Sequence, residues 1–321
     1  MELWYNQPMH IELKGVTKTF GNGSRMHHAV QQVSFEARSG EVLGILGPNG
    51  AGKTTMIRML LDILRPDEGQ ILVDGQAEAN RAPEFKANTG YLPEERGLYQ
   101  RRKVSDVLWY LGAIKGLTRD EALARGERLL ARLGLEGWQT KRINELSKGM
   151  GQKVQIACSL LHDPDLVVLD EPFSGLDPVN VRLVRRLVAD LRSEGKVILL
   201  STHLMAEVEA LCDRIVMIHQ GQKVLEGEVD AVKRTHTPWD VMVDPDTPLH
   251  DLVAVAEAKS GEAVTWLRLS PGHSITTLMA ELGQKGRPVR MLREATTPLE
   301  DIFVGLVGEA PVEVPLMEAA K

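Results

Sequence analysis

Residues 47–54 read Gly47-Pro48-Asn49-Gly50-Ala51-Gly52-Lys53-Thr54, a glycine-rich stretch that ends in a lysine and a hydroxyl residue. Four residues separate the first glycine from the Gly-Lys-Thr triplet, which is the spacing of a phosphate-binding loop. The pattern predicts a strand at 41–46 and a helix at 53–64 on either side. In that context backbone N–H groups and the helix N-terminus can hold phosphate oxygens. A chance glycine-rich turn is the alternative, and the flanks favour a nucleotide-binding α/β core.

Two side chains of this loop have expected roles of their own. A second motif, which is acidic, follows later in the chain. Lys53 would reach the β- and γ-phosphates, and the Thr54 hydroxyl would ligate Mg²⁺. A short apolar stretch at 166–169 ends in Asp170 and Glu171, as expected for a buried strand of a parallel sheet. Asp170 is then a candidate for the Mg²⁺ shell, and Glu171 for the general base facing the attacking water. An apolar run that ends in Asp-Glu is often only a strand end, but the phosphate loop favours the functional reading.

His203 directly follows Thr202 at the end of the predicted strand 197–200. Ligands bind at the carboxyl edge of open α/β sheets, so this side chain is a candidate γ-phosphate contact. A lone histidine more often has a structural role. Only its position at the carboxyl edge of the sheet makes His203 a candidate contact for the γ-phosphate.

The composition narrows the class of protein. The 321 residues include 44 acidic and 38 basic residues, a net charge of −6, which argues against indiscriminate binding to nucleic acid. The two cysteines allow at most one disulfide and suit a reduced cytosol. The strongest apolar runs hold four residues each, whereas a membrane-spanning helix needs about 20. We therefore expect a soluble protein that acts at a membrane only through a partner.

In this order the motifs resemble the ATP-binding subunit of an ABC transporter, over about residues 9–230. Leu146-Ser-Lys-Gly-Met150 resembles the signature of that family, and Ser174-Gly-Leu-Asp177 resembles its D-loop. The resemblance implies that Phe20 stacks on adenine, that residues 47–55 including Thr55 hold the phosphates, and that His203 is the switch histidine.

The same resemblance implies that the site is shared between two subunits. Ser147 and Gly149 of one chain would offer a hydroxyl and a backbone N–H to the γ-phosphate of ATP held by the other chain. The partners implied are a second ATP-binding subunit, in a homodimer or a heterodimer, and an integral-membrane permease. The cofactors implied are ATP and Mg²⁺, and no nucleic acid is expected.

Two positions depart from the usual pattern of the family. Glu94 follows Gly90-Tyr-Leu-Pro93 where a glutamine is usual, and Met150 also replaces a glutamine. A carboxylate is a good oxygen ligand for Mg²⁺, so Glu94 is a candidate metal ligand. Both variants resemble a bacterial exporter branch that includes sodium and drug extruders and that has a C-terminal accessory domain like residues 234–308.

The expected fold is a P-loop NTPase core at 1–233, with an antiparallel β subdomain and a helical insertion at about 95–160. Residues 234–308 are expected to form a small α+β domain, followed by a disordered tail at 309–321. Within this domain the patterns predict strands at 237–243 and 263–269 and helices at 249–259, 274–282 and 299–306.

The expected function is ATP hydrolysis that drives transport, with export favoured, through a separate permease at the cytoplasmic face of the membrane. One alternative is a soluble ABC ATPase that acts on DNA or ribosomes, although the chain has neither a long coiled-coil insertion nor two cassettes. Another is a catalytically idle regulatory subunit, which the intact Lys53, Asp170, Glu171 and His203 argue against.

Overall fold

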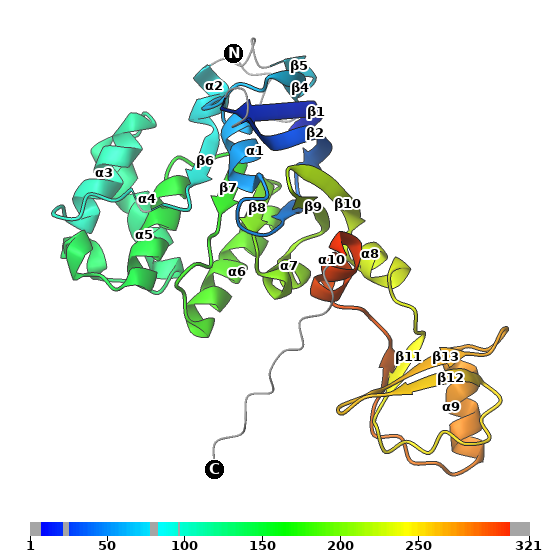
Figure 1. Ribbon diagram of the computed structural model, residues 1–321. Coiled ribbons are helices and arrows are strands. Elements are labelled where there is room, and N and C mark those ends of the chain that lie inside the picture. The colour runs from blue at the N-terminus through cyan, green and yellow to red at the C-terminus, as the bar shows by residue number, and fades with distance from the viewer. Residues whose placement is uncertain (1–7, 22–25, 78–82, 96, 309–321) are drawn as a thin grey trace. The chain divides into compact units, whose positions relative to one another are not determined.

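The computed structural model describes residues 8–21, 26–77, 83–95 and 97–308 (Figure 1). The chain divides into two compact units, residues 1–229 and 230–321. The domain boundary expected after Lys233 lies inside helix α8 (Val229–Thr235), a few residues beyond this division. The tail expected at 309–321 lies outside the described residues.

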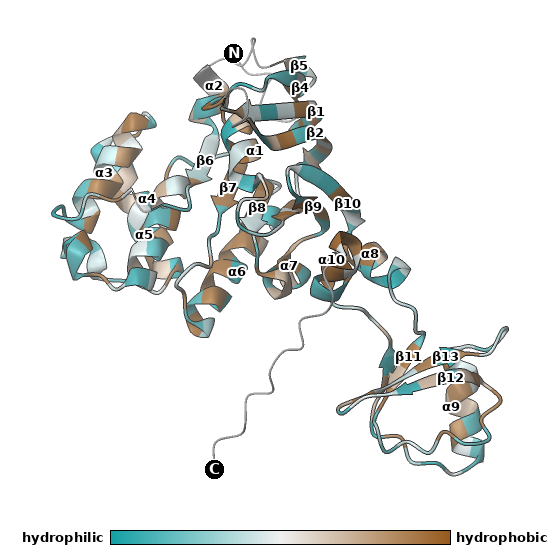
Figure 2. Cartoon of the chain, viewed as in Figure 1, coloured by the Kyte–Doolittle hydropathy of each residue, from teal (hydrophilic) through white to brown (hydrophobic). Residues whose placement is uncertain are grey.

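A six-stranded sheet forms the centre of the first unit, in the order β10-β9-β3-β8-β7-β6. Its strands are β3 (Val42–Leu46), β6 (Thr89–Leu92), β7 (Leu166–Asp170), β8 (Val197–Thr202), β9 (Arg214–His219) and β10 (Gln222–Glu228). All pairings are parallel except that of β10. Every residue of β3, β7 and β8 is buried, which explains their continuous apolar runs (Figure 2). Because the strands are parallel, the segments that follow β3, β6, β7 and β8 meet at one edge of the sheet.

An antiparallel sheet, in the order β2-β1-β4-β5, packs on this core. It consists of β1 (His10–Phe20), β2 (His27–Arg38), β4 (Glu68–Val73) and β5 (Gln76–Ala77). Alternate residues such as Ile11, Leu13 and Val33 are buried, and they share one hydrophobic cluster with Met56 of helix α1 and Val168 of β7. The two sheets therefore form one domain, as the sequence predicted.

Helices complete the first unit, and α3–α5 form a group beside β6 and β7 (Figure 1). The helices are α1 (Lys53–Leu60), α2 (Pro83–Ala87), α3 (Val104–Ile114), α4 (Arg119–Arg132), α5 (Lys148–Leu160), α6 (Pro178–Ser193) and α7 (Met205–Leu211). The expected α/β core with its helical insertion is thus confirmed. The expectation that α1 reaches residue 64 is wrong, because Asp62 adopts a left-handed φ of 53° that a helix cannot accommodate. Among the described residues no helix is both long and apolar enough to cross a membrane.

The second unit has its own antiparallel sheet, in the order β12-β13-β11-β14, and its own hydrophobic cluster. Its elements are β11 (Val241–Val243), β12 (Val255–Ser260), β13 (Thr265–Leu269), β14 (Leu292–Glu294), α9 (Ile275–Gln284) and α10 (Leu299–Val307). The helix expected at 249–259 is wrong, because β12 occupies part of that stretch and pairs with β13. A short apolar run fits either element, and here the neighbouring strand decides between them.

Candidate functional site

The phosphate-binding loop joins β3 to α1 and folds tightly against its neighbours. A Cβ atom at Gly47 would collide with the carbonyl oxygen of Ile218, and one at Gly52 with that of Ala29. Gly52 also has a φ of 108°, which side chains other than glycine rarely adopt. The buried ammonium group of Lys53 donates hydrogen bonds to the carbonyl oxygens of Gly47 (2.8 Å) and Pro48 (3.3 Å). The glycines are therefore required by the backbone path, which places the lysine within the loop.

Asp170, at the end of β7, contacts the first turn of α1. The Thr54 hydroxyl donates a hydrogen bond of 2.9 Å to Oδ2 of Asp170, and Asp170 is only 1% exposed. Burial raises the pKa of Asp170 above its ordinary value, and the hydrogen bond from Thr54 opposes that shift. A buried carboxylate of this kind gains stability from a cation placed beside it.

Glu171 is the next residue, and three hydrogen bonds hold its side chain. Its carboxylate accepts a hydrogen bond from the Thr202 hydroxyl (3.1 Å) and another from the backbone N–H of His203 (3.1 Å). Nδ1 of the His203 ring lies 2.8 Å from the same carboxylate, and Nζ of Lys53 lies 3.9 Å from it. Glu171 is 5% exposed and has a left-handed φ of 49°. A carboxylate fixed so firmly can orient a neighbouring water and accept its proton.

A pocket of about 440 Å³ brings these groups together. The sequence predicted eleven of its lining residues: Phe20, Asn49, Gly50, Ala51, Gly52, Lys53, Thr54, Thr55, Glu94, and the acidic pair Asp170 and Glu171. The lining also includes His27 and Ala29 of β2, which the sequence analysis missed. His27 pairs with Phe20 across the β1–β2 hairpin, so the choice of Phe20 could have suggested it.

The remaining candidates lie outside the lining that the structure describes. Ser147 caps α5, where its hydroxyl accepts a hydrogen bond from the backbone N–H of Met150. Gly149 lies against the D-loop, because a Cβ there would come within 3.2 Å of the Gly175 carbonyl oxygen. His203 reaches the pocket only through Glu171. The two signature residues therefore do not complete the pocket of their own chain.

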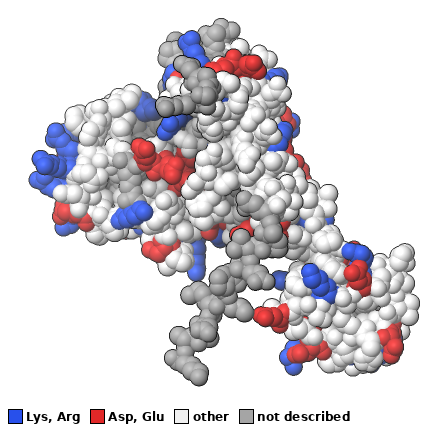
Figure 3. Space-filling model, in the orientation of Figure 1, with Lys and Arg blue, Asp and Glu red and all other residues white. Residues whose placement is uncertain are grey.

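The donor atoms around the pocket suit a hard divalent cation. Thr54, Asp170 and Glu94 supply hydroxyl and carboxylate oxygens, the ligands that Mg²⁺ prefers. Acidic side chains also gather between the helical group and the sheet on the visible face of the first unit (Figure 3). Burial lowers the pKa of Lys53, and the charges of Glu171 and Asp170 oppose that shift. The residues present thus fit Mg²⁺ together with a phosphate ligand.

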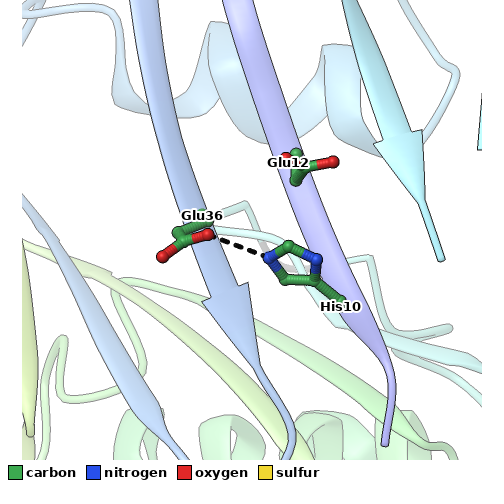
Figure 4. A group of neighbouring side chains, drawn as sticks. All are labelled: His10, Glu12 and Glu36. Carbon is green, nitrogen blue, oxygen red and sulfur yellow. Dashed lines mark hydrogen bonds and ion pairs between the residues drawn. The ribbon is translucent and has the colours of Figure 1, made fainter. Parts of the chain in front are cut away.

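A second group of potential ligands lies on β1 and β2, where His10, Glu12 and Glu36 come within 4.8 Å of one another (Figure 4). His10 binds Glu36 at 3.0 Å, Arg38 lies 2.6 Å from Glu36, and Lys14 lies 3.0 Å from Glu12. The two glutamates face each other across the strands, and the charges of Arg38 and Lys14 offset their repulsion. We interpret the group as an ion-pair network and assign no metal to it.

Comparison with known proteins identifies the family. A family model described as ABC transporter matches residues 30–174. The ABC transporter ATP-binding protein NatA of Bacillus subtilis is 41% identical over 232 residues, which cover 72% of this chain and 94% of the relative. The Nod factor export ATP-binding protein I of Burkholderia lata is 36% identical over 304 residues, which cover 93% of this chain and 97% of the relative.

A solved structure described as a dimeric bacterial ABC transporter cassette also resembles the chain. It aligns with a TM-score of 0.63 and 26% identity, over 68% of this chain and 98% of that one. These similarities agree with three features of the structure: the phosphate loop, the acidic end of β7 and the fold. The chain therefore belongs to the family of ABC transporter ATP-binding subunits, and it is an ATP-hydrolysing enzyme with a P-loop NTPase fold.

Proposed function

We propose that this ATPase drives export through a separate integral-membrane permease, and that it works as a pair of ATP-binding subunits. The observation that carries the paired arrangement is the position of the signature. Ser147 and Gly149 lie outside the pocket that their own chain forms, so a γ-phosphate bound there would meet them only from a second subunit. The dimeric cassette that resembles this chain supports the same arrangement.

In the proposed site each residue has a distinct task. Phe20 stacks on the adenine, and the backbone N–H groups of residues 49–55 hold the phosphates. Lys53 exchanges its contacts with the loop carbonyls for the β- and γ-phosphates, since its ammonium already lies inside the loop. Glu171 accepts the proton of the attacking water, and His203 lies beside both the carboxylate and the γ-phosphate.

Thr54, Asp170 and Glu94 would hold Mg²⁺, because they are the oxygen donors that line the pocket. When bound, the ion neutralises charge on the β- and γ-phosphates. Glu94 differs from the other two in being exposed, and it follows β6, the edge strand next to the strand β7 that ends in Asp170. The usual glutamine of the family is here replaced by a stronger oxygen ligand.

Replacing Glu94 tests its role as a metal ligand. Glu94→Gln should keep substantial ATPase activity, since an amide oxygen also coordinates Mg²⁺, whereas Glu94→Ala should lose activity about ten- to a hundredfold at low Mg²⁺. The Mg²⁺ dependence of hydrolysis should shift in both variants. Glu95→Ala is the matched control, because it removes the adjacent exposed carboxylate. A normal Mg²⁺ dependence in Glu94→Ala would make Glu94 an ordinary solvated loop residue.

The export direction rests on the Nod factor export relative, whose alignment covers nearly the whole chain. The test is made with inside-out membrane vesicles from cells that express this chain together with the permease encoded beside it. The chain should remain on the vesicles only when the permease is present. Vesicles should then accumulate radioactive sodium or a fluorescent drug when ATP is added outside. Accumulation only in right-side-out vesicles that were loaded with ATP would instead identify an importer.

A further inference from the structure

Gln155, on helix α5, contacts the loop that contains Glu94. Its side-chain amide nitrogen donates hydrogen bonds to the carbonyl oxygens of Glu95 (3.0 Å) and Pro93 (3.4 Å). Gln155 is 6% exposed, so the donor comes from a buried side chain, although the two hydrogen bonds themselves are only partly buried. The two acceptors are the residues directly before and after Glu94. A single buried amide group therefore fixes the backbone on both sides of this carboxylate.

The surroundings make this contact well defined. Helix α5 lies directly against β6, the strand that leads into the loop, because a Cβ at Gly90 would collide with the carbonyl oxygen of Ser159. The loop itself has no regular secondary structure at Glu94 and Glu95, so strand pairing does not fix it beyond Leu92. The distance between α5 and β6 is thus fixed, and Gln155 sets the path of the chain that follows.

A second glutamine makes the corresponding contact one turn earlier on the same helix. The amide nitrogen of Gln152 lies 3.5 Å from the carbonyl oxygen of Glu171 and 3.4 Å from that of Pro172. Residues three apart on a helix share a face, so both glutamines project from one side of α5. This face therefore contacts the two loops that bring carboxylates to the nucleotide pocket, and Ser147 caps the same helix.

We propose that Gln155 is a positioning residue for Glu94, which holds the carboxylate toward Thr54 and Asp170. This inference rests on the proposed role of Glu94 as a metal ligand. Without Gln155 the two carbonyl groups lose their donor, and the loop can turn the Glu94 carboxylate away from Thr54 and Asp170. Because the signature residue Ser147 begins the same helix, a movement of α5 on contact with a second subunit would also move Glu94.

The test compares Gln155→Met with the unaltered full-length chain. Methionine has a similar length and remains apolar, but it cannot donate a hydrogen bond. The affinity for a fluorescent trinitrophenyl-ATP is measured first in EDTA and then during a titration with Mg²⁺. We expect the Mg²⁺ concentration for half-maximal effect to rise about tenfold. The affinity in EDTA should stay within about twofold, because the phosphate loop is unchanged.

Two controls separate a positioning role from a general loss of structure. Ser159→Ala alters a buried side chain on the same helix, whose hydroxyl donates a hydrogen bond to the Ile156 carbonyl of that helix, and it should leave both affinities unchanged. In a Glu94→Ala background, Gln155→Met should add no further change in Mg²⁺ dependence, since it acts through a side chain that is no longer present.

Every other outcome contradicts the proposal. An unchanged Mg²⁺ dependence in Gln155→Met, with Glu94→Ala impaired, removes the positioning role and leaves the metal role of Glu94 intact. If Gln155→Met changes the Mg²⁺ dependence equally with and without the Glu94 side chain, then Gln155 does not act through Glu94. Loss of affinity in EDTA makes Gln155 a general structural residue. A normal Mg²⁺ dependence in Glu94→Ala removes both roles, while hydrolysis by the unaltered chain still supports the ATPase.

Discussion

Glu171→Gln should reduce ATP hydrolysis by about 10²- to 10⁴-fold while ATP still binds, because a general base contributes on this scale. The amide keeps the size of the side chain. Its oxygen can accept from the His203 N–H in place of Oε1, and its NH₂ group can donate to the Thr202 hydroxyl oxygen in place of Oε2. What it loses is the ability to accept a proton. Phosphate release measures the first effect, and calorimetry with ATP measures the second.

The same variant also tests the paired site. With hydrolysis blocked, ATP bound in the pocket should persist long enough to recruit the Ser147–Gly149 segment of a second subunit. A dimer should therefore accumulate on gel filtration with ATP and disperse with ADP. Glu207→Gln is the control, because it neutralises another acidic side chain, one paired with Arg185 on helix α6. Full turnover in Glu171→Gln would move the general base to another group, with His203 or Glu94 next in line.

Most of the first unit could be predicted because its signals are local. Strands β3, β7 and β8 are buried on both faces and thus read as short apolar runs, and Thr118 caps α4 through hydrogen bonds within four residues. Strand β12 could not be predicted in this way. Its residues are mostly exposed, and only the pairing with β13, a tertiary contact, makes it a strand.

The residues of the site also fall into those with a local sequence signal and those without one. The phosphate loop and Asp170-Glu171 have a fixed order and spacing, so the sequence alone suggested them and the structure places them around one pocket. Thr202 and Gln155 gave no such signal, because a threonine in a strand and a glutamine in a helix are common. Each gains its role from a residue about 30 to 60 positions away, Thr202 from Glu171 and Gln155 from the Pro93 carbonyl.

Lys53→Ala should weaken ATP binding by about 2–5 kcal/mol, the range measured when one partner of a buried, hydrogen-bonded charge pair is removed. The Lys53 ammonium lies in a buried position where desolvation lowers its pKa, so a phosphate anion is the natural partner for its charge. Without it, the loop would offer the β- and γ-phosphates no positively charged side chain, and the Glu171 carboxylate would lie near them without the Lys53 ammonium beside it. Calorimetry with ATP in the presence and absence of Mg²⁺ measures the loss.

The variant must also remain folded, and the structure indicates that it should. Alanine leaves the Gly47 and Pro48 carbonyl groups without the ammonium donor, but it also removes a charge that burial disfavours, and the two effects oppose each other. The midpoint temperature of thermal unfolding without nucleotide should therefore change little. The rise in this temperature on adding ATP should disappear. Lys53→Met, which retains most of the side-chain stem, should behave like Lys53→Ala, since the charge and not the packing is required. Unchanged ATP affinity in both variants would contradict the assignment of residues 47–54 as the phosphate-binding loop.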